Sequence, residues 1–162
     1  MDTAVLLKEF DGEMATTRRL LERVPDQKGA WKPHAKSFSL EHLAQLVSWM
    51  PGWITQSLTQ TTLNLSGAPP YSSEKTATLL ADFDKNVAGA HAAIAAASPA
   101  DWNVSWSLVM GDKTLMTMPR HEVVRQTINH LVHHRAQLGV YLRLLDVPVP
   151  SMYGPTADER WG

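Results

Sequence analysis

Three of the seven histidines of this chain lie within five residues, in the run Asn129-His130-Leu131-Val132-His133-His134-Arg135-Ala136-Gln137. In a helix, residues four apart differ by about 40° around the axis and lie about 6 Å apart along it. The imidazoles of His130 and His134 can therefore point at one ion, as in one half of a helical metal site. The same spacing is equally compatible with two histidines on a solvated helix face or against core residues.

The rest of the chain limits what such a site can be. His133 is rotated by about 100° from His134, so we expect it to be exposed or to hydrogen-bond beside the site. The sequence contains no cysteine, so a metal would be held by histidine together with carboxylate or water. A catalytic zinc takes three protein ligands and a water molecule. A third ligand must therefore come from elsewhere in the chain.

Length, charge and composition exclude several classes of protein. The 162 residues fit one domain, 1–162, with its own hydrophobic core. A net charge of −1 and a pI near 6.6 indicate no general attraction to nucleic acid or to an anionic membrane surface. The sequence has no apolar run long enough to span a bilayer and begins without the pattern of a signal peptide, so we expect a cytoplasmic protein.

Four amphipathic helices are predicted from the spacing of apolar residues. They cover Asp2 to Val24, a segment from Ser39 to about Leu58, a segment that carries Leu80, Phe83, Val87 and Ile94, and a segment from Pro119 to about Leu142. Ser39 is a plausible N-cap for the second helix, and Pro51-Gly52 should kink or briefly interrupt it. A serine of the loop 65–73 is a plausible cap for the third.

A β-hairpin is predicted between the third and fourth helices. Apolar residues alternate from Trp102 to Met110, and Lys113 to Met118 return after the turn at Gly111-Asp112. The tail from Val147 onward is too rich in proline and polar residues for a regular element. Four helices of this length bury their apolar faces most simply in an antiparallel bundle, so the expected fold is an all-α four-helix bundle with a small hairpin before the last helix.

With these elements in place, the sequence resembles the DinB-like superfamily over nearly its whole length. The histidine run carries much of the resemblance, and shorter motifs occur in the order typical of the family. These are Trp31-Lys32-Pro33-His34, Leu43-Ala44, Met50-Pro51-Gly52-Trp53, Met118-Pro119-Arg120 and Tyr153-Gly154-Pro155-Thr156-Ala157-Asp158-Glu159.

The resemblance implies an up-down-down-up bundle, often a homodimer, with a divalent metal (zinc or nickel) held by three histidines. Two of these would be His130 and His134, from the last helix. The third commonly follows a Leu-Ala-x pattern in the second helix, but that position here is Leu46. His42 lies one turn earlier on the same face and is the candidate for the third ligand. An exposed His42, or one bonded to the helix end, is an equally good interpretation.

Two functions are compatible with these residues. With three neutral imidazoles, a bound metal would lower the pKa of a water molecule or bind a thiolate, and so support hydrolysis or group transfer on a small molecule. Gln137 and Tyr141 would then line the pocket or orient a ligand, and packing in the core or in an interface is an equally good interpretation of both. In the alternative, a noncatalytic dimeric bundle uses Trp49, Trp53 and the methionine-rich hairpin as a dimer surface or a small-molecule pocket and keeps a degenerate metal site. No serine nucleophile motif, phosphate loop or carboxylate pair is present.

Overall fold

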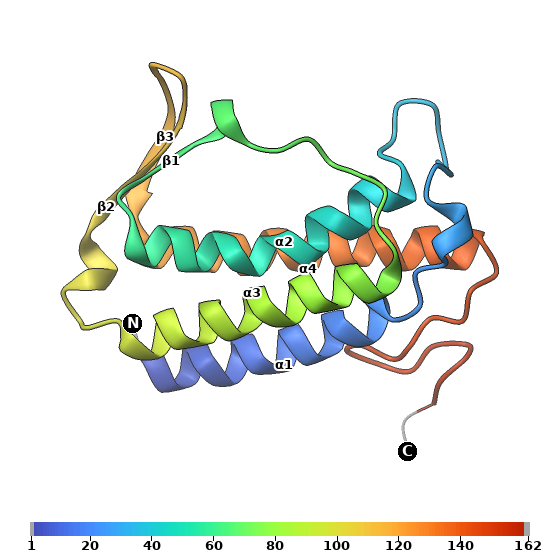
Figure 1. Cartoon of the computed structure of the whole chain (residues 1–162). Helices are drawn as coiled ribbons and strands as arrows, with labels where there is room; N and C mark the ends of the chain where they lie inside the picture. Colours follow the sequence, from blue (N-terminus) through green and yellow to red (C-terminus); the bar gives the residue numbers. More distant parts are fainter. Residues whose placement is uncertain (1, 161–162) are drawn as a thin grey trace.

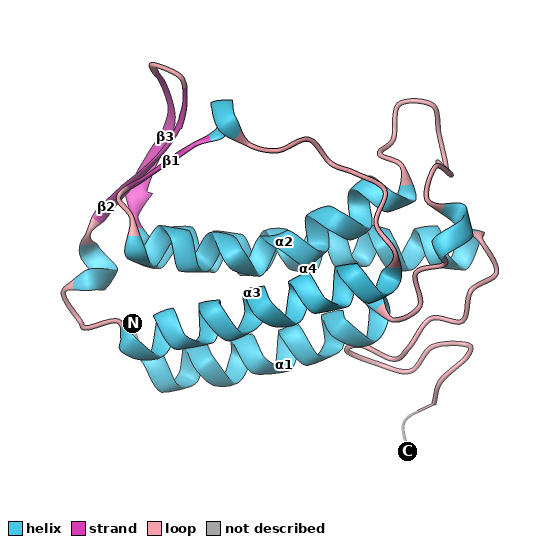
Figure 2. Ribbon diagram, in the orientation of Figure 1, coloured by secondary structure: helices cyan, strands magenta, loops and turns pink. Residues whose placement is uncertain are grey.

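The structure is a computed structural model that describes residues 2–160, and four long helices dominate it (Figure 1). The helices pack side by side around the hydrophobic core, and three short strands form a sheet near the end of α2 and the start of α4 (Figure 2). The elements are α1 (Thr3–Leu21), α2 (Leu40–Thr59), β1 (Thr62–Asn64), α3 (Thr76–Ala96), β2 (Ser105–Met110), β3 (Lys113–Pro119) and α4 (Arg120–Leu144). None of the described helices has the length and apolar character needed to cross a membrane.

The predicted helices at the two ends of the chain are confirmed. Asp2 caps α1 by accepting hydrogen bonds from the backbone N–H groups of Ala4 and Val5. Each helix buries one apolar stripe, as its spacing predicts. The buried stripe of α1 includes Leu6, Phe10, Met14, Thr17 and Leu21, and that of α4 includes Val124, Ile128, Leu131, Leu138 and Leu142.

Helix α2 starts as predicted, with Ser39 as its N-cap. The Ser39 hydroxyl accepts a hydrogen bond from the His42 backbone N–H at 3.4 Å. The helix continues without interruption from Leu40 to Thr59 although Pro51 lies inside it. The backbone hydrogen bonds of the helix therefore tolerate the loss of the one bond that this proline cannot donate.

The cap of α3 differs from the prediction of a serine. The residue before the helix is Lys75, whose side chain makes no capping bond. Instead, the Asp26 carboxylate accepts hydrogen bonds from the backbone N–H of Thr76, at 2.8 Å, and from its hydroxyl, at 2.7 Å. These bonds lower the pKa of Asp26. The cap comes from a residue about 50 positions away in sequence, which no local pattern can indicate.

The predicted hairpin is the larger part of a three-stranded sheet with the order β1-β2-β3. Strands β2 and β3 pair antiparallel, and Gly111 takes φ +59° in the turn between them, a conformation that suits glycine. Strand β1 pairs parallel with β2, with Leu63 opposite Leu108. The prediction of a hairpin therefore missed strand β1. This strand has only three residues, and it pairs with residues that lie more than 40 positions later in the sequence.

The segment 65–75, which we call the strap, connects the sheet to α3 and arches over α2 (Figure 1). Gln45 of α2 is almost fully buried and holds the strap at Ser72. Its amide accepts a bond from the Ser72 backbone N–H at 2.7 Å and donates one to the Ser72 hydroxyl at 3.1 Å. This two-point contact fixes the strap above the α2 face that carries the tryptophans.

The tail after α4 has no regular element up to residue 160, as predicted. Polar contacts hold it against the helices. Tyr153 contacts both Glu13 and the buried guanidinium of Arg135, while Arg19 binds Glu159 and Arg143 binds Asp158.

Candidate functional site

His130 and His134 of α4 point at each other, as their spacing predicts. Their Nε2 atoms lie 2.9 Å apart, and their ring centroids are 4.6 Å apart. Two nitrogen ligands of a tetrahedral zinc ion with bonds of about 2.0–2.1 Å would stand about 3.3 Å apart. A small rotation of either ring would therefore let both Nε2 atoms bind one ion, so the pair fits a divalent metal.

Gln137 determines which nitrogen of His134 carries the proton. Its side-chain oxygen lies 2.7 Å from His134 Nδ1, and its amide nitrogen lies 3.1 Å from His133 Nε2. The oxygen can only accept, so Nδ1 of His134 donates and Nε2 keeps its lone pair. That lone pair faces His130. Residue 137 thus acts as the orienting partner that metal-binding histidines usually have.

His42 lies in a different environment from this pair. Its ring is stacked between two aromatic rings, with centroid distances of 4.1 Å to Phe38 and 3.8 Å to Tyr71 of the strap. Within residues 2–160, no three histidine or acidic side chains come close enough together to hold a metal ion. In this conformation His42 is therefore a neighbour of the pair rather than a third donor beside it.

Leu46 occupies the part of α2 that lies opposite the histidine pair. His42, Leu46, Trp49 and Trp53 are spaced 4-3-4 and so share one face of the helix. Near the start of this face, the ring centroid of Phe38, which precedes α2, lies 6.5 Å from that of His134. At the other end, the ring centroid of Trp53 lies 5.9 Å from that of His130. Leu46 lies between these two contacts and is only 5% exposed. The position at which the resemblance implies a third ligand thus lies on the α2 face between these two contacts, and it carries an apolar side chain.

The remaining histidines lie outside the site, as expected. His34 and His91 are exposed, and His91 Nε2 is 3.6 Å from the Asp11 carboxylate. His121 bonds through Nδ1 to the carbonyl of Trp102 at 3.0 Å. His133 is exposed and meets only the Gln137 amide and the edge of His134.

The environment of the site favours the neutral form of its histidines, although only His134 is buried and His130 is exposed. Desolvation is the main cause that lowers the pKa of His134, of His130 and of His42. Protonating any one of them is further disfavoured by a neighbouring histidine, and for His42 also by Lys32. For His134, the hydrogen bond with Gln137 partly opposes this lowering of the pKa. Neutral imidazoles are the form that binds metal. The pair is therefore available to an ion at neutral pH without first losing a proton.

These lowered pKa values predict that acid destabilises the fold. A histidine whose pKa is lower in the folded state binds protons more readily when the protein is unfolded. Its contribution to the free energy of unfolding is therefore fully present above the unfolded-state pKa, about 6.5, and decreases as the pH falls below that value. We expect the urea midpoint to fall between about pH 7.5 and about pH 5.5, above the range where carboxylates titrate. In His134→Gln this fall should be smaller. An equal midpoint at both pH values in the parent protein would contradict the prediction.

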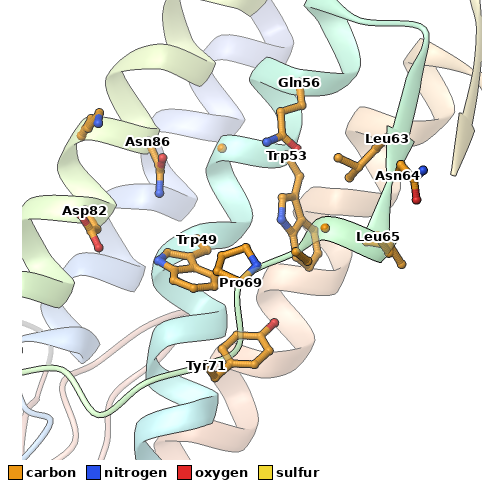
Figure 3. A pocket seen from close by; sticks show the side chains of 14 residues that line it. Trp49, Trp53, Gln56, Leu63, Asn64, Leu65, Pro69, Tyr71, Asp82 and Asn86 are labelled. Atoms are coloured by element: carbon orange, nitrogen blue, oxygen red, sulfur yellow. The ribbon is translucent and has the colours of Figure 1, made fainter. Parts of the chain in front are cut away.

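Two cavities flank Trp53, one of the residues for which the sequence suggested a small-molecule pocket as an alternative to a dimer surface. The larger, about 540 Å³, lies under the strap and is lined by Trp49, Trp53, Tyr71, Pro69 and polar side chains that include Asn86 and Asp82 (Figure 3). The smaller, about 300 Å³, lies between α2, α4 and the sheet. Trp53, Leu63 and Leu65 line both cavities, and His130 lines the smaller one. The alternation of Trp106 and Leu108 predicted a packed strand face but not the empty volume beside it.

Two other residues singled out in the sequence have identifiable contacts. Tyr141 is buried, donates a hydrogen bond from its hydroxyl to the Phe38 carbonyl at 3.3 Å, and meets the edge of the Trp31 ring. It therefore supports the segment that carries Phe38. Gln137, by contrast, contacts the histidines directly.

Comparison with known proteins identifies the family of this chain and supports its fold. The model of the DinB family matches residues 1–161. A DinB-like protein from Bacillus cereus superposes with a TM-score of 0.72 at 18% identity, over 91% of this chain and 95% of that one. A DinB-like protein from Bacillus subtilis superposes with a TM-score of 0.69 at 16% identity, over 95% of this chain and 98% of that one. No curated protein matches the sequence. At these identities the two structures support the fold alone.

Proposed function

Because the chain belongs to the DinB family, we propose that it binds a divalent metal ion, zinc or nickel, through His130 and His134. The observation that carries the proposal is the convergence of two Nε2 atoms at 2.9 Å, with the His134 lone pair set by Gln137. Water, or a group of a bound small molecule, would fill the remaining positions. Bound there, the ion would lower the pKa of a water molecule or bind a thiolate, which suits hydrolysis or group transfer.

His42 remains the candidate third ligand, but it would have to leave its stack between Phe38 and Tyr71. Each aromatic pair contributes about 0.5–1.5 kcal/mol, so leaving both costs about 1–3 kcal/mol. A third metal–imidazole bond can repay a cost of that size. His42→Ala should then lower metal affinity, whereas equal affinity would leave two protein ligands only.

The experiment that tests the proposal is elemental analysis of protein prepared without a histidine tag. We expect nearly one equivalent of zinc or nickel, and loss of that metal in His130→Ala and in His134→Ala. His133→Ala is the matched control, because His133 is adjacent but points away from the ion, and it should keep the metal. Metal-free parent protein after exposure to zinc and nickel salts would refute the proposal.

Gln137 should influence metal affinity without being a ligand. Gln137→Leu removes the acceptor that holds Nδ1–H of His134 and is expected to weaken metal binding about 10–100-fold. Gln137→Glu keeps an acceptor at the same place and should retain most of the affinity. Isothermal titration with zinc measures both variants. Equal affinities for Gln137→Leu and the parent protein would show that the amide has no orienting role.

A noncatalytic binding bundle with a degenerate metal site is the second candidate function. Leu46 at the usual ligand position favours it, as does the position of His42 in an aromatic stack. Metal-free protein of unchanged stability would support this candidate. We also propose that the helices follow the up-down-down-up order and that the protein forms a homodimer. Light scattering in solution, which measures the molar mass, tests the homodimer.

A further inference from the structure

His42, the candidate third ligand, lies inside a stack of four rings. The order of the rings is Phe38, His42, Tyr71 and Trp49, with centroid distances of 4.1, 3.8 and 5.3 Å and interplanar angles of 13°, 20° and 22°. Phe38 precedes α2, His42 and Trp49 belong to α2, and Tyr71 comes from the strap. The rings are thus nearly parallel, and the imidazole is held by its two faces.

This stack covers the faces of the imidazole and leaves its nitrogens unbonded. Neither ring nitrogen of His42 makes a hydrogen bond within residues 2–160, and the bond to Ser39 is made by the backbone N–H. Desolvation, together with repulsion from Lys32 and from His134, lowers the pKa of His42 and favours its neutral form. A neutral imidazole with unbonded nitrogens can bind a metal once it leaves the stack.

The strap holds Tyr71 in this stack. Gln45 is 2% exposed and bonds to both the backbone N–H and the hydroxyl of Ser72, the residue after Tyr71. Tyr71 itself is 36% exposed, so the strap and the stack, rather than the hydrophobic core, determine its position. Its ring also packs on Trp49 and lines the larger cavity (Figure 3). Tyr71 therefore joins the surroundings of His42 to this cavity.

We propose that Tyr71 is a positioning residue that holds His42 outside the metal site, so that binding of the metal by His42 breaks its contact with the strap. The inference rests on the proposed function, with His42 as the third ligand, and describes how that site is regulated. A contact that must be broken for binding lowers the apparent metal affinity. By linkage, the bound metal weakens the contact between His42 and Tyr71 by the same factor.

Two replacements of Tyr71, compared by isothermal titration with zinc on protein without a histidine tag, test this inference. Tyr71→Ala removes the ring and is expected to bind zinc about 2–10-fold more tightly, which is the affinity equivalent of one aromatic pair. Tyr71→Phe keeps the ring and should bind zinc like the parent protein. A merely structural role of Tyr71 would lower stability without raising the affinity for zinc.

The double variant with His42→Ala and Tyr71→Ala shows whether the effect passes through His42. When His42 is already absent, replacing Tyr71 should change zinc affinity by less than about 2-fold. Proton NMR provides a second readout. The ring protons of His42, identified by their loss in His42→Ala, lie between two aromatic faces in the metal-free parent protein and should move downfield when zinc is added.

The inference is overturned if Tyr71→Ala and the parent protein bind zinc equally, or if the gain in affinity persists without His42. Zinc bound through His130 and His134, with an affinity that neither His42→Ala nor Tyr71→Ala changes, would sustain the metal site and refute this inference alone. A parent protein that takes up no zinc would refute the proposed function, and the inference with it.

Discussion

Replacement of Arg135 by alanine is expected to lower the free energy of unfolding by about 3–5 kcal/mol. Arg135 is 1% exposed and its Nη1 lies 2.6 Å from the Glu13 carboxylate of α1. The guanidinium also donates to the Thr17 hydroxyl and to the Tyr153 hydroxyl, at 3.2 and 2.9 Å. Truncation leaves a largely buried carboxylate without its cation and removes one of the contacts that hold the tail against the helices. Urea denaturation measures the change.

Arg143→Ala is the control for this prediction. Arg143 lies on the same helix and pairs with Asp158, but its side chain is 47% exposed. An exposed ion pair contributes about 0–1 kcal/mol, so this variant should stay near the parent protein. If both arginine variants lost the same stability, burial of the Arg135–Glu13 pair would not be the cause.

Replacement of Leu46 by histidine is expected to raise metal affinity at least about 10-fold, because a direct ligand should contribute no less than a residue such as Gln137 that only orients a ligand. Leu46 lies on the α2 face between the contacts of Phe38 with His134 and of Trp53 with His130, so we expect an imidazole there to supply a third nitrogen ligand. The metal-free variant should be less stable than the parent protein, because a buried leucine is replaced by a polar ring. Zinc at about 100 times its dissociation constant should then add about 2.7 kcal/mol to stability.

Leu46→Gln separates ligation from polarity in this test. It introduces a polar side chain of similar length that is a poor ligand for zinc, so stability should fall without a gain in metal affinity. Isothermal titration with zinc, together with thermal unfolding with and without the ion, measures both effects. If Leu46→His bound zinc no more tightly than the parent protein, residue 46 would not face the histidine pair.

The DinB assignment and the four helices could be predicted from the sequence because their signals are local. Apolar residues three and four positions apart, such as Leu6, Phe10 and Met14, indicate a helix, and so do capping residues such as Ser39. The convergence of His130 and His134 follows from the same geometry, since one turn of helix fixes the relation of two residues. These predictions required no knowledge of any other segment.

Tertiary structure decided the features that depend on contacts between distant segments. The pairing of β1 with β2, the cap that Asp26 provides for α3, and the stacking of Tyr71 on His42 each join residues far apart in sequence. Whether His42 or Leu46 faces the histidine pair depends on how α2 packs against α4. The cavity beside Trp106 likewise exists only once the sheet is placed over the helices. Periodicity within one segment carries no information about these arrangements, because packing between segments determines them.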